Sequence, residues 1–342
     1  MTTTPANPYL EGNFGPVHEE VTLTDLPVTG RIPEHLDGRY LRNGPNPIVA
    51  PDPSRYHWFM GDGMVHGLRL RDGRAEWYRN RWSRSVHVAD TLGEPHPSGT
   101  SVSGFDLAPN TNVIGHAGRT FAIVEAGSRP YELTDELDTV GACDFDGTLP
   151  GGYTAHPKRD PETGELHAVS YFWAWGKKLQ YTVIDPQARV RRIVDIEVTG
   201  SPMVHDFSLT ERHVVVYDLP VTFSMAHVEA GDAFPYRWDA DYPALVGVIY
   251  RYTDGSDIRW FDVDPCYVFD PLNAYDEGST VVLDVVRHPS MFDTERRGPS
   301  EGPPNLHRWT VDLAGGKVIE TLLDDRVQEF PRVDERVVGR RH

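Results

Sequence analysis

The stretch HDFSLTERHVVVYDLP, residues 205–220, begins with a potential metal ligand, passes through a turn-rich segment and enters a strongly apolar strand. The same order recurs in HPKRDPETGELHAVSYFW (residues 156–173) and in DPLNAYDEGSTVVLDVVRH (residues 270–288). Their first residues, His156, His205 and Asp270, lie 49 and 65 positions apart. Common propeller blades repeat every ~40–50 residues, and equivalent positions of successive blades face one central axis. The spacing therefore favours three blades whose polar first residues converge.

The rest of the chain continues this pattern of short β-type runs between turns. Runs rich in β-branched and aromatic residues occupy positions 120–124, 167–173, 213–219, 245–252 and 280–286. The 31 glycines and 28 prolines supply the breaks between them, and helical periodicity is not sustained over any window. We therefore expect an all-β fold with short helical caps, built as stacked sandwiches or as a radial array of four-stranded blades. No linker divides the chain, so residues 1–342 are predicted to form one domain.

Composition narrows the classes of partner and compartment. The chain has 33 Lys and Arg against 51 Asp and Glu, a formal net charge of −18, which argues against nucleic acid as a partner. Only two cysteines occur, Cys143 and Cys266, which indicates a reducing compartment. No run approaches the ~20 apolar residues of a membrane span. We expect a soluble, cytoplasmic protein, with peripheral membrane contact left open.

Two of the fifteen histidines stand out as candidate metal ligands. His156 and His205 each lie in a short loop segment that leads into a strand, whereas the others, His288 among them, are interpreted as surface or ordinary core residues. Two imidazoles suggest a shared Fe, Zn, Cu or Ni ion, and metal-bound histidines usually donate their second ring nitrogen to a carboxylate. Glu125 and Glu329 are candidates for that carboxylate. The alternative for each glutamate is an ordinary strand end on a solvated rim.

Seven motifs follow one another along the chain: GRYLRNGPNP (residues 38–47), HWFMGDGMVHGLRLRDGRAEWYRNRW (57–82), APNTNVIGHAGRTFAIVEAG (108–127), TAHPK (154–158), MVHDFSLT (203–210), PCYVFDPLNAYDEG (265–278) and EFPRVDER (329–336). In this order they resemble the carotenoid cleavage oxygenase family. The resemblance implies a seven-bladed β-propeller with a non-haem Fe(II) on its axis, held by four histidines, three of which bond to glutamates. It implies insertion of O2 across one alkene of a carotenoid, apocarotenoid or stilbene, giving two carbonyl fragments. His156 and His205 match the first two ligands, and Glu125 and Glu329 match two of the glutamates.

The chain departs from the family pattern in two places. Asp270 stands where the resemblance places the third histidine ligand. The fourth ligand and the remaining glutamate belong to family segments well beyond EFPRVDER, whereas the sequence given ends at residue 342. We therefore expect a propeller that is incomplete at its C-terminal end by a blade or two. Exposed strand edges would then favour self-association.

These departures leave two functions open. His156, His205 and Asp270 form the two-histidine, one-carboxylate triad of many Fe(II) oxygenases. On that interpretation the protein is an Fe(II)-dependent dioxygenase that cleaves a C=C bond of a carotenoid or apocarotenoid. The alternative is an inactive homologue that binds an apolar ligand or a partner chain, because aspartate is shorter than histidine and its loop must move to reach the metal. The branch of the family that cleaves hydroxystilbenes carries a lysine before the first glutamate. Here that residue is Val124, so an apocarotenoid-like apolar alkene is the predicted substrate, together with O2.

Overall fold

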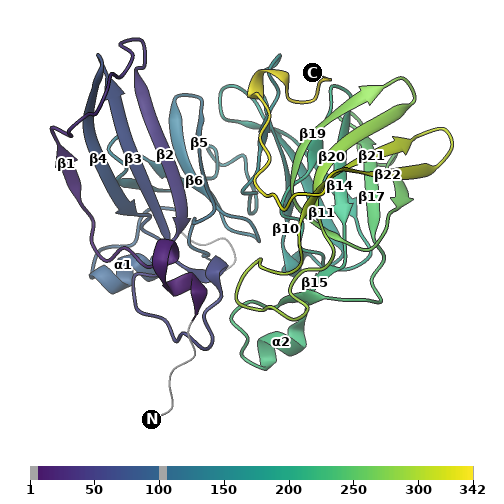
Figure 1. Ribbon diagram of the computed structural model, residues 1–342, viewed down its shortest axis with the longest axis horizontal. Coiled ribbons are helices and arrows are strands. Elements are labelled where there is room, and N and C mark those ends of the chain that lie inside the picture. The colour runs from purple at the N-terminus through teal and green to yellow at the C-terminus, as the bar shows by residue number, and fades with distance from the viewer. Residues whose placement is uncertain (1–6, 100–105, 342) are drawn as a thin grey trace. The chain divides into compact units, whose positions relative to one another are not determined.

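The computed structural model describes residues 7–99 and 106–341, and nearly all of its regular structure is antiparallel β-sheet (Figure 1). The chain divides into two compact units. Unit 1 comprises Met1–Val124 and Ser128–Gly151, and unit 2 comprises Glu125–Gly127 and Gly152–His342. The all-β prediction is confirmed, whereas the prediction of a single domain stays a prediction. In the described ranges no helix is long and apolar enough to cross a membrane.

The described residues of unit 1 form two four-stranded antiparallel sheets. The first has the order β1-β4-β3-β2, with β1 (Thr22–Thr24), β2 (Gly38–Pro45), β3 (Gly63–Arg71) and β4 (Arg74–Trp82). The second has the order β5-β6-β7-β8, with β5 (Asn112–His116), β6 (Arg119–Ile123), β7 (Tyr131–Leu133) and β8 (Thr139–Ala142). Short helices lie outside these sheets: η1 (Pro8–Leu10), η2 (Gly12–Phe14), η3 (Trp58–Met60) and α1 (Val86–Leu92).

The two sheets of unit 1 share one apolar core. Val65 of the first sheet packs in one cluster with Ala122 and Leu133 of the second, and all three are nearly inaccessible to solvent. The sharp turn between β3 and β4 uses Asp72 and Gly73, both at positive φ (48° and 70°). Two consecutive residues of positive φ form the turn type that matches the twist of a tight hairpin, as the Asp-Gly dipeptide predicts.

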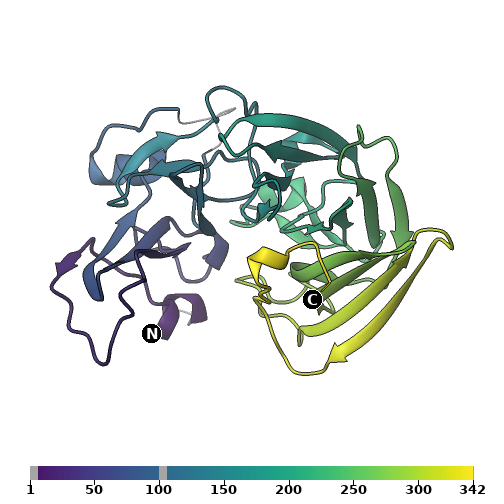
Figure 2. The ribbon, with the colours of Figure 1, turned by 90° about the horizontal axis from the view of Figure 1, so that it is seen from above.

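Unit 2 contains three four-stranded antiparallel sheets and one inserted hairpin (Figure 2). The first sheet, β12-β11-β10-β9, has β9 (Lys158–Arg159), β10 (Leu166–Tyr171), β11 (Lys178–Ile184) and β12 (Val190–Glu197). The second, β13-β14-β17-β18, has β13 (Ser208–Leu209), β14 (His213–Asp218), β17 (Leu245–Tyr250) and β18 (Arg259–Asp262). The third, β19-β20-β21-β22, has β19 (Tyr267–Glu277), β20 (Thr280–His288), β21 (Asn305–Asp312) and β22 (Lys317–Asp324). The hairpin of β15 (Val221–Phe223) and β16 (Tyr236–Trp238) carries α2 (Met225–Glu229); η4 (Trp173–Trp175) and η5 (Glu335–Val337) complete the unit.

Strands β10 and β14 are buried along their whole length. Their sequences, LHAVSY and HVVVYD, are largely continuous apolar runs, because both faces of each strand are covered and neither needs alternating polar side chains. Both strands are inner members of their sheets, and a short strand, β9 or β13, pairs at the edge beside each of them. These edge strands follow the segments that carry His156 and His205.

A buried polar network ties the first two sheets of unit 2 together. Arg251, which follows β17, forms an ion pair with Asp160 and donates to Nε2 of His167 at 2.8 Å. Nδ1 of His167 lies 2.7 Å from the Tyr181 hydroxyl. Because the guanidinium only donates, His167 is held as a neutral imidazole that accepts at Nε2. Burial, followed by the positive charge of Arg251, lowers the pKa of His167 to about 3.

Candidate metal centre

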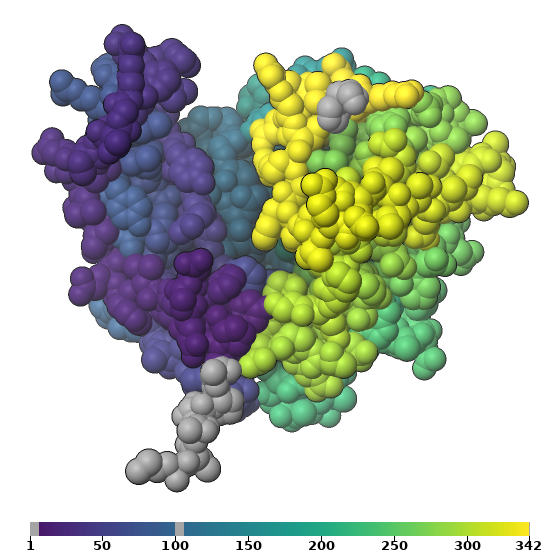
Figure 3. All heavy atoms as spheres, viewed as in Figure 1, coloured from purple at the N-terminus to yellow at the C-terminus, as the bar shows by residue number. Residues whose placement is uncertain are grey.

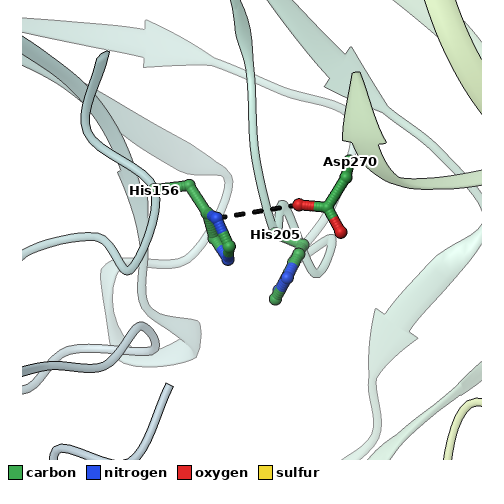
Figure 4. A group of neighbouring side chains, drawn as sticks. All are labelled: His156, His205 and Asp270. Carbon is green, nitrogen blue, oxygen red and sulfur yellow. Dashed lines mark ion pairs between the residues drawn. The ribbon is translucent and has the colours of Figure 1, made fainter. Parts of the chain in front are cut away.

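Three side chains from separate parts of unit 2 meet at one point. His156, His205 and Asp270 each offer a ligand atom, and these atoms all lie within 4.8 Å of one another. The two imidazole centroids are 4.2 Å apart, and Nδ1 of His156 lies 3.7 Å from Oδ1 of Asp270 (Figure 4). The three residues that begin the recurring sequence stretches are thus brought together.

Each of these residues lies in, or just before, the first strand of its sheet. His156 lies two residues before β9 and His205 three residues before β13. Asp270 lies inside β19, where the pairing with β20 shifts register between Val268 and Pro271. Such irregularities in a ladder re-aim side chains and are common next to active sites.

The two imidazoles differ in protonation because their surroundings differ. Burial lowers the pKa of His156 to about 3, and the charge of His205 lowers it further. Burial also acts to lower the pKa of His205, but the carboxylates of Glu125, Asp270 and Asp206 together outweigh it and raise that pKa to about 9. His156 is therefore a neutral base with a free lone pair, and its buried Nε2 has no hydrogen-bond partner among the described residues. A neutral imidazole with an unpaired nitrogen is the form that binds a transition metal.

Glu125 takes the position that a carboxylate partner of a metal-binding histidine requires. Its Oε2 lies 2.9 Å from Nδ1 of His205, which leaves Nε2 of that ring for a metal. The buried hydroxyl of Tyr171, at the end of β10, donates to the Glu125 carboxylate. Tyr171 carries no functional signal in the sequence, because a tyrosine within an apolar run is typical of a core position.

Glu329 has a different partner from the one that the sequence suggested. Its Oε2 lies 3.0 Å from Nε2 of His288, at the end of β20, and the described ion pairs join it to neither His156 nor His205. The interpretation of His288 as an ordinary surface or core residue missed this pair. The ring of Phe269 packs edge-on against both His205 and His288, at 5.2 and 5.3 Å between centroids. Nothing in the local sequence signals a contact that spans 41 residues.

A second ion pair adjoins the centre. Lys158, two residues after His156, places Nζ 2.9 Å from Oδ2 of Asp206, the residue that follows His205. Burial raises the pKa of Asp206 to about 6, although Lys158 opposes that shift. Neither residue was a candidate from the sequence, where both look like ordinary charged loop residues.

The donor set fits a divalent first-row metal ion. Two imidazoles and one carboxylate form the facial triad of non-haem Fe(II) oxygenases, which leaves positions open for O2 and substrate. The negative charge of Asp270 favours a cation, and the unpaired Nε2 of His156 provides a donor atom that the protein itself leaves unused. The residues present therefore suit an Fe(II) ion.

Comparison with known proteins gives concordant matches over nearly all of the chain. The family model described as "Retinal pigment epithelial membrane protein" matches residues 14–342. The carotenoid cleavage oxygenase of Mycobacterium tuberculosis is 55% identical over all of this chain and 78% of its own length. Carotenoid 9,10(9',10')-cleavage dioxygenase 1 of Phaseolus vulgaris is 33% identical over 97% of this chain and 67% of its own length.

A solved structure shows the same fold. The lignostilbene dioxygenase of Pseudomonas brassicacearum superposes with a TM-score of 0.85 at 28% identity, covering all of this chain and 76% of the other. The predicted β-propeller fold is confirmed, and the described residues carry five four-stranded sheets of the seven blades that the sequence resemblance implies. The family match, the two relatives and the shared fold agree: this chain belongs to the retinal pigment epithelial membrane protein family, the carotenoid cleavage oxygenases.

Proposed function

We propose that this chain binds Fe(II) through His156, His205 and Asp270 and cleaves a C=C double bond of a carotenoid or apocarotenoid to two carbonyl products. The observation that carries the proposal is the meeting of these three side chains, with ligand atoms within 4.8 Å, in a member of an oxygenase family. An Fe(II) ion with open positions supplies the capacity to bind and activate O2.

The protein's own residues set the geometry and charge of the centre. His156 is already neutral at physiological pH, so its lone pair needs no proton loss before it binds a metal. His205 is held by the carboxylate of Glu125 and must release one proton from its other nitrogen. The Asp270 carboxyl group lies beside the ring of His156, and the Tyr171 hydroxyl donates to Glu125 and holds it in place.

The substrate is proposed to be an apolar alkene. Val124 precedes Glu125 and offers neither charge nor hydrogen bond to a phenol, which favours an apocarotenoid-like molecule over a hydroxystilbene. The names of two relatives, a carotenoid cleavage oxygenase and a carotenoid 9,10(9',10')-cleavage dioxygenase, support the same class.

A second candidate function is binding without catalysis. It is favoured by Asp270, which stands where the family resemblance places a histidine, and by Glu329, which pairs with His288 instead of supporting a ligand. On this alternative the chain retains an apolar ligand or a partner chain but holds no iron tightly.

Iron content decides between the two. Purified protein is reconstituted anaerobically with Fe(II), freed of excess metal and analysed for iron per chain, beside His156→Ala, Asp270→Ala and the exposed control His35→Ala. The proposal expects near-stoichiometric iron in the parent and the control and loss in the other two. A folded parent without iron refutes it, and so does iron retained in both ligand variants. Iron-loaded protein is then incubated with an apocarotenal and O2, and the aldehyde products are identified by mass spectrometry.

Self-association is a separate proposal, based on the free edge of the third sheet of unit 2. Among the residues that the structure describes, strand β22 pairs with β21 and with no other strand. It exposes Ile319 and Leu322 (64% and 52% exposed), and nearby Phe330 is 72% exposed. This C-terminal part lies at the surface (Figure 3). An edge strand with apolar side chains is a template for pairing with another chain. Light scattering after size exclusion should show an assembly that Leu322→Lys disrupts, and a monomer at all concentrations would contradict this proposal.

A further inference from the structure

The two candidate histidines lie in loops that belong to different sheets. His156 leads into β9, which pairs with β10, whereas His205 leads into β13, which pairs with β14. Strands β9 and β13 are in separate sheets, so backbone hydrogen bonds within either sheet do not set the spacing of the two rings. A metal centre tolerates only small errors in ligand position, about 0.5 Å.

The ion pair between Lys158 and Asp206 joins these two loops next to the rings. Nζ of Lys158 and Oδ2 of Asp206 are 2.9 Å apart, although the residues are 48 positions apart in sequence. The other carboxylate oxygen of Asp206 accepts the backbone N–H of Phe207 at 2.6 Å, and the Lys158 ammonium lies 5.6 Å from the centre of the Phe207 ring. Each end of the pair is therefore held by a second contact.

This ion pair is largely shielded from water. The Asp206 side chain is 4% exposed and the Lys158 side chain 21% exposed. A buried ion pair adds little net stability compared with apolar residues of the same volume, but it fixes the groups that it joins. Its position, one residue from His205 and two from His156, favours a geometric role.

We propose that the Lys158–Asp206 ion pair positions His156 and His205 relative to each other and thereby sets the affinity and geometry of the metal centre. The inference rests on the proposed metal-binding function. Lys158 and Asp206 act through the ligands, so both are positioning residues.

For Lys158→Met, a purely electrostatic effect would change the metal affinity in the opposite direction. Lys158 carries a positive charge close enough to His156 to lower the pKa of that ring, so it also repels a metal cation. If charge were its only effect, Lys158→Met would tighten metal binding. If the ion pair positions the two histidines, the same substitution weakens metal binding. The loop of His156 is then no longer held, and Asp206 is left buried without a counter-ion.

The test uses Co(II) as the probe, titrated into metal-free protein and followed by its visible ligand-field absorption. The variants are Lys158→Met, Asp206→Asn and the double variant, with Lys178→Met as the matched control. Lys178 forms an ion pair of the same length, 2.9 Å, with Asp195, but at the surface of β11 and β12. We expect each single variant to bind Co(II) about 10–100-fold more weakly with a shifted spectrum, the usual effect of losing a partner of a metal ligand. The fold-loss in Co(II) affinity of the double variant should be smaller than the product of the two single fold-losses. Lys178→Met should bind Co(II) with the affinity of the parent.

Parent-like or tighter Co(II) binding by Lys158→Met with an unshifted spectrum overturns the inference. A parent protein that binds no Co(II) overturns the proposed function instead. Crystal structures of the metal-free parent and of Lys158→Met then test the positioning role of the ion pair independently of metal binding. The two rings, 4.2 Å apart between centroids in the parent, should separate in the variant, and an unchanged separation refutes the inference.

Discussion

Mild acid should destabilise this protein through His167. The imidazole is completely buried between Arg251 and Tyr181, and its pKa is lowered to about 3 by burial and by the guanidinium. In the unfolded chain the same side chain has a pKa of about 6.5. Between these two pH values the imidazole takes up a proton in the unfolded chain but stays neutral in the folded protein. The contribution of neutral His167 to the free energy of unfolding is therefore fully present above pH 6.5 and is lost as the pH falls towards 3.

The size of this effect follows from proton linkage. At pH 5.5 an unfolded histidine is about ten-elevenths protonated while folded His167 stays neutral, which lowers the free energy of unfolding by about 1.4 kcal/mol. At pH 7.5 the same contribution is below about 0.1 kcal/mol. Other groups also titrate in this range, among them Asp206 with its raised pKa of about 6. They contribute equally to the parent and to a variant at position 167, so a comparison of the two isolates His167.

The assay is urea unfolding at pH 7.5 and pH 5.5, followed by tryptophan fluorescence. The parent is compared with His167→Gln, whose amide oxygen can still accept from Arg251 but does not titrate, and with the exposed control His35→Gln. His167→Gln should lack about 1.4 kcal/mol of the pH-dependent loss that the parent and His35→Gln both show. An identical loss in all three proteins would refute the assignment of a neutral, buried His167.

Three further substitutions test the surrounding structure. Glu125→Gln should weaken Co(II) binding by about 10–100-fold, because the charge that orients His205 is lost; unchanged affinity in the titration would contradict the role of this carboxylate. Arg251→Met should lower the free energy of unfolding by about 3–5 kcal/mol, because it leaves Asp160 buried without its partner, and a urea midpoint equal to the parent's would count against the ion pair. Gly127→Ala should lower the melting temperature, because that residue has φ +100° and an added Cβ would lie 2.6 Å from a phenylalanine ring; an unchanged melting curve would show that the loop relaxes freely.

The sequence predicted the strands better than it predicted the contacts of the centre. The apolar runs at 120–124, 213–219 and 280–286 correspond to β6, β14 and β20, because alternation and β-branched composition are local properties. The three recurring stretches begin with His156, His205 and Asp270, which the fold brings together. The first two lie just before β9 and β13, and Asp270 lies inside β19.

The partners of these residues were predicted unevenly. Of the two candidate glutamates, Glu125 lies beside His205, whereas Glu329 pairs with His288, which no sequence pattern singled out. The Lys158–Asp206 pair was not predicted either, because neither residue departs from ordinary loop composition.

Local sequence patterns were enough to predict the all-β class and to show the motifs that place this chain in its family. These features depend on side-chain periodicity and on turn residues, which act over a few positions of the chain. The packing of the sheets, by contrast, sets which charges meet, which imidazole is neutral and which glutamate lies beside His205. Such contacts join residues 41 to 91 positions apart, as in His288–Glu329 and Asp160–Arg251, and they depend on how separate sheets pack and exclude water. Burial then sets the protonation of each group, because the cost of removing a charge from water exists only once the chain is folded.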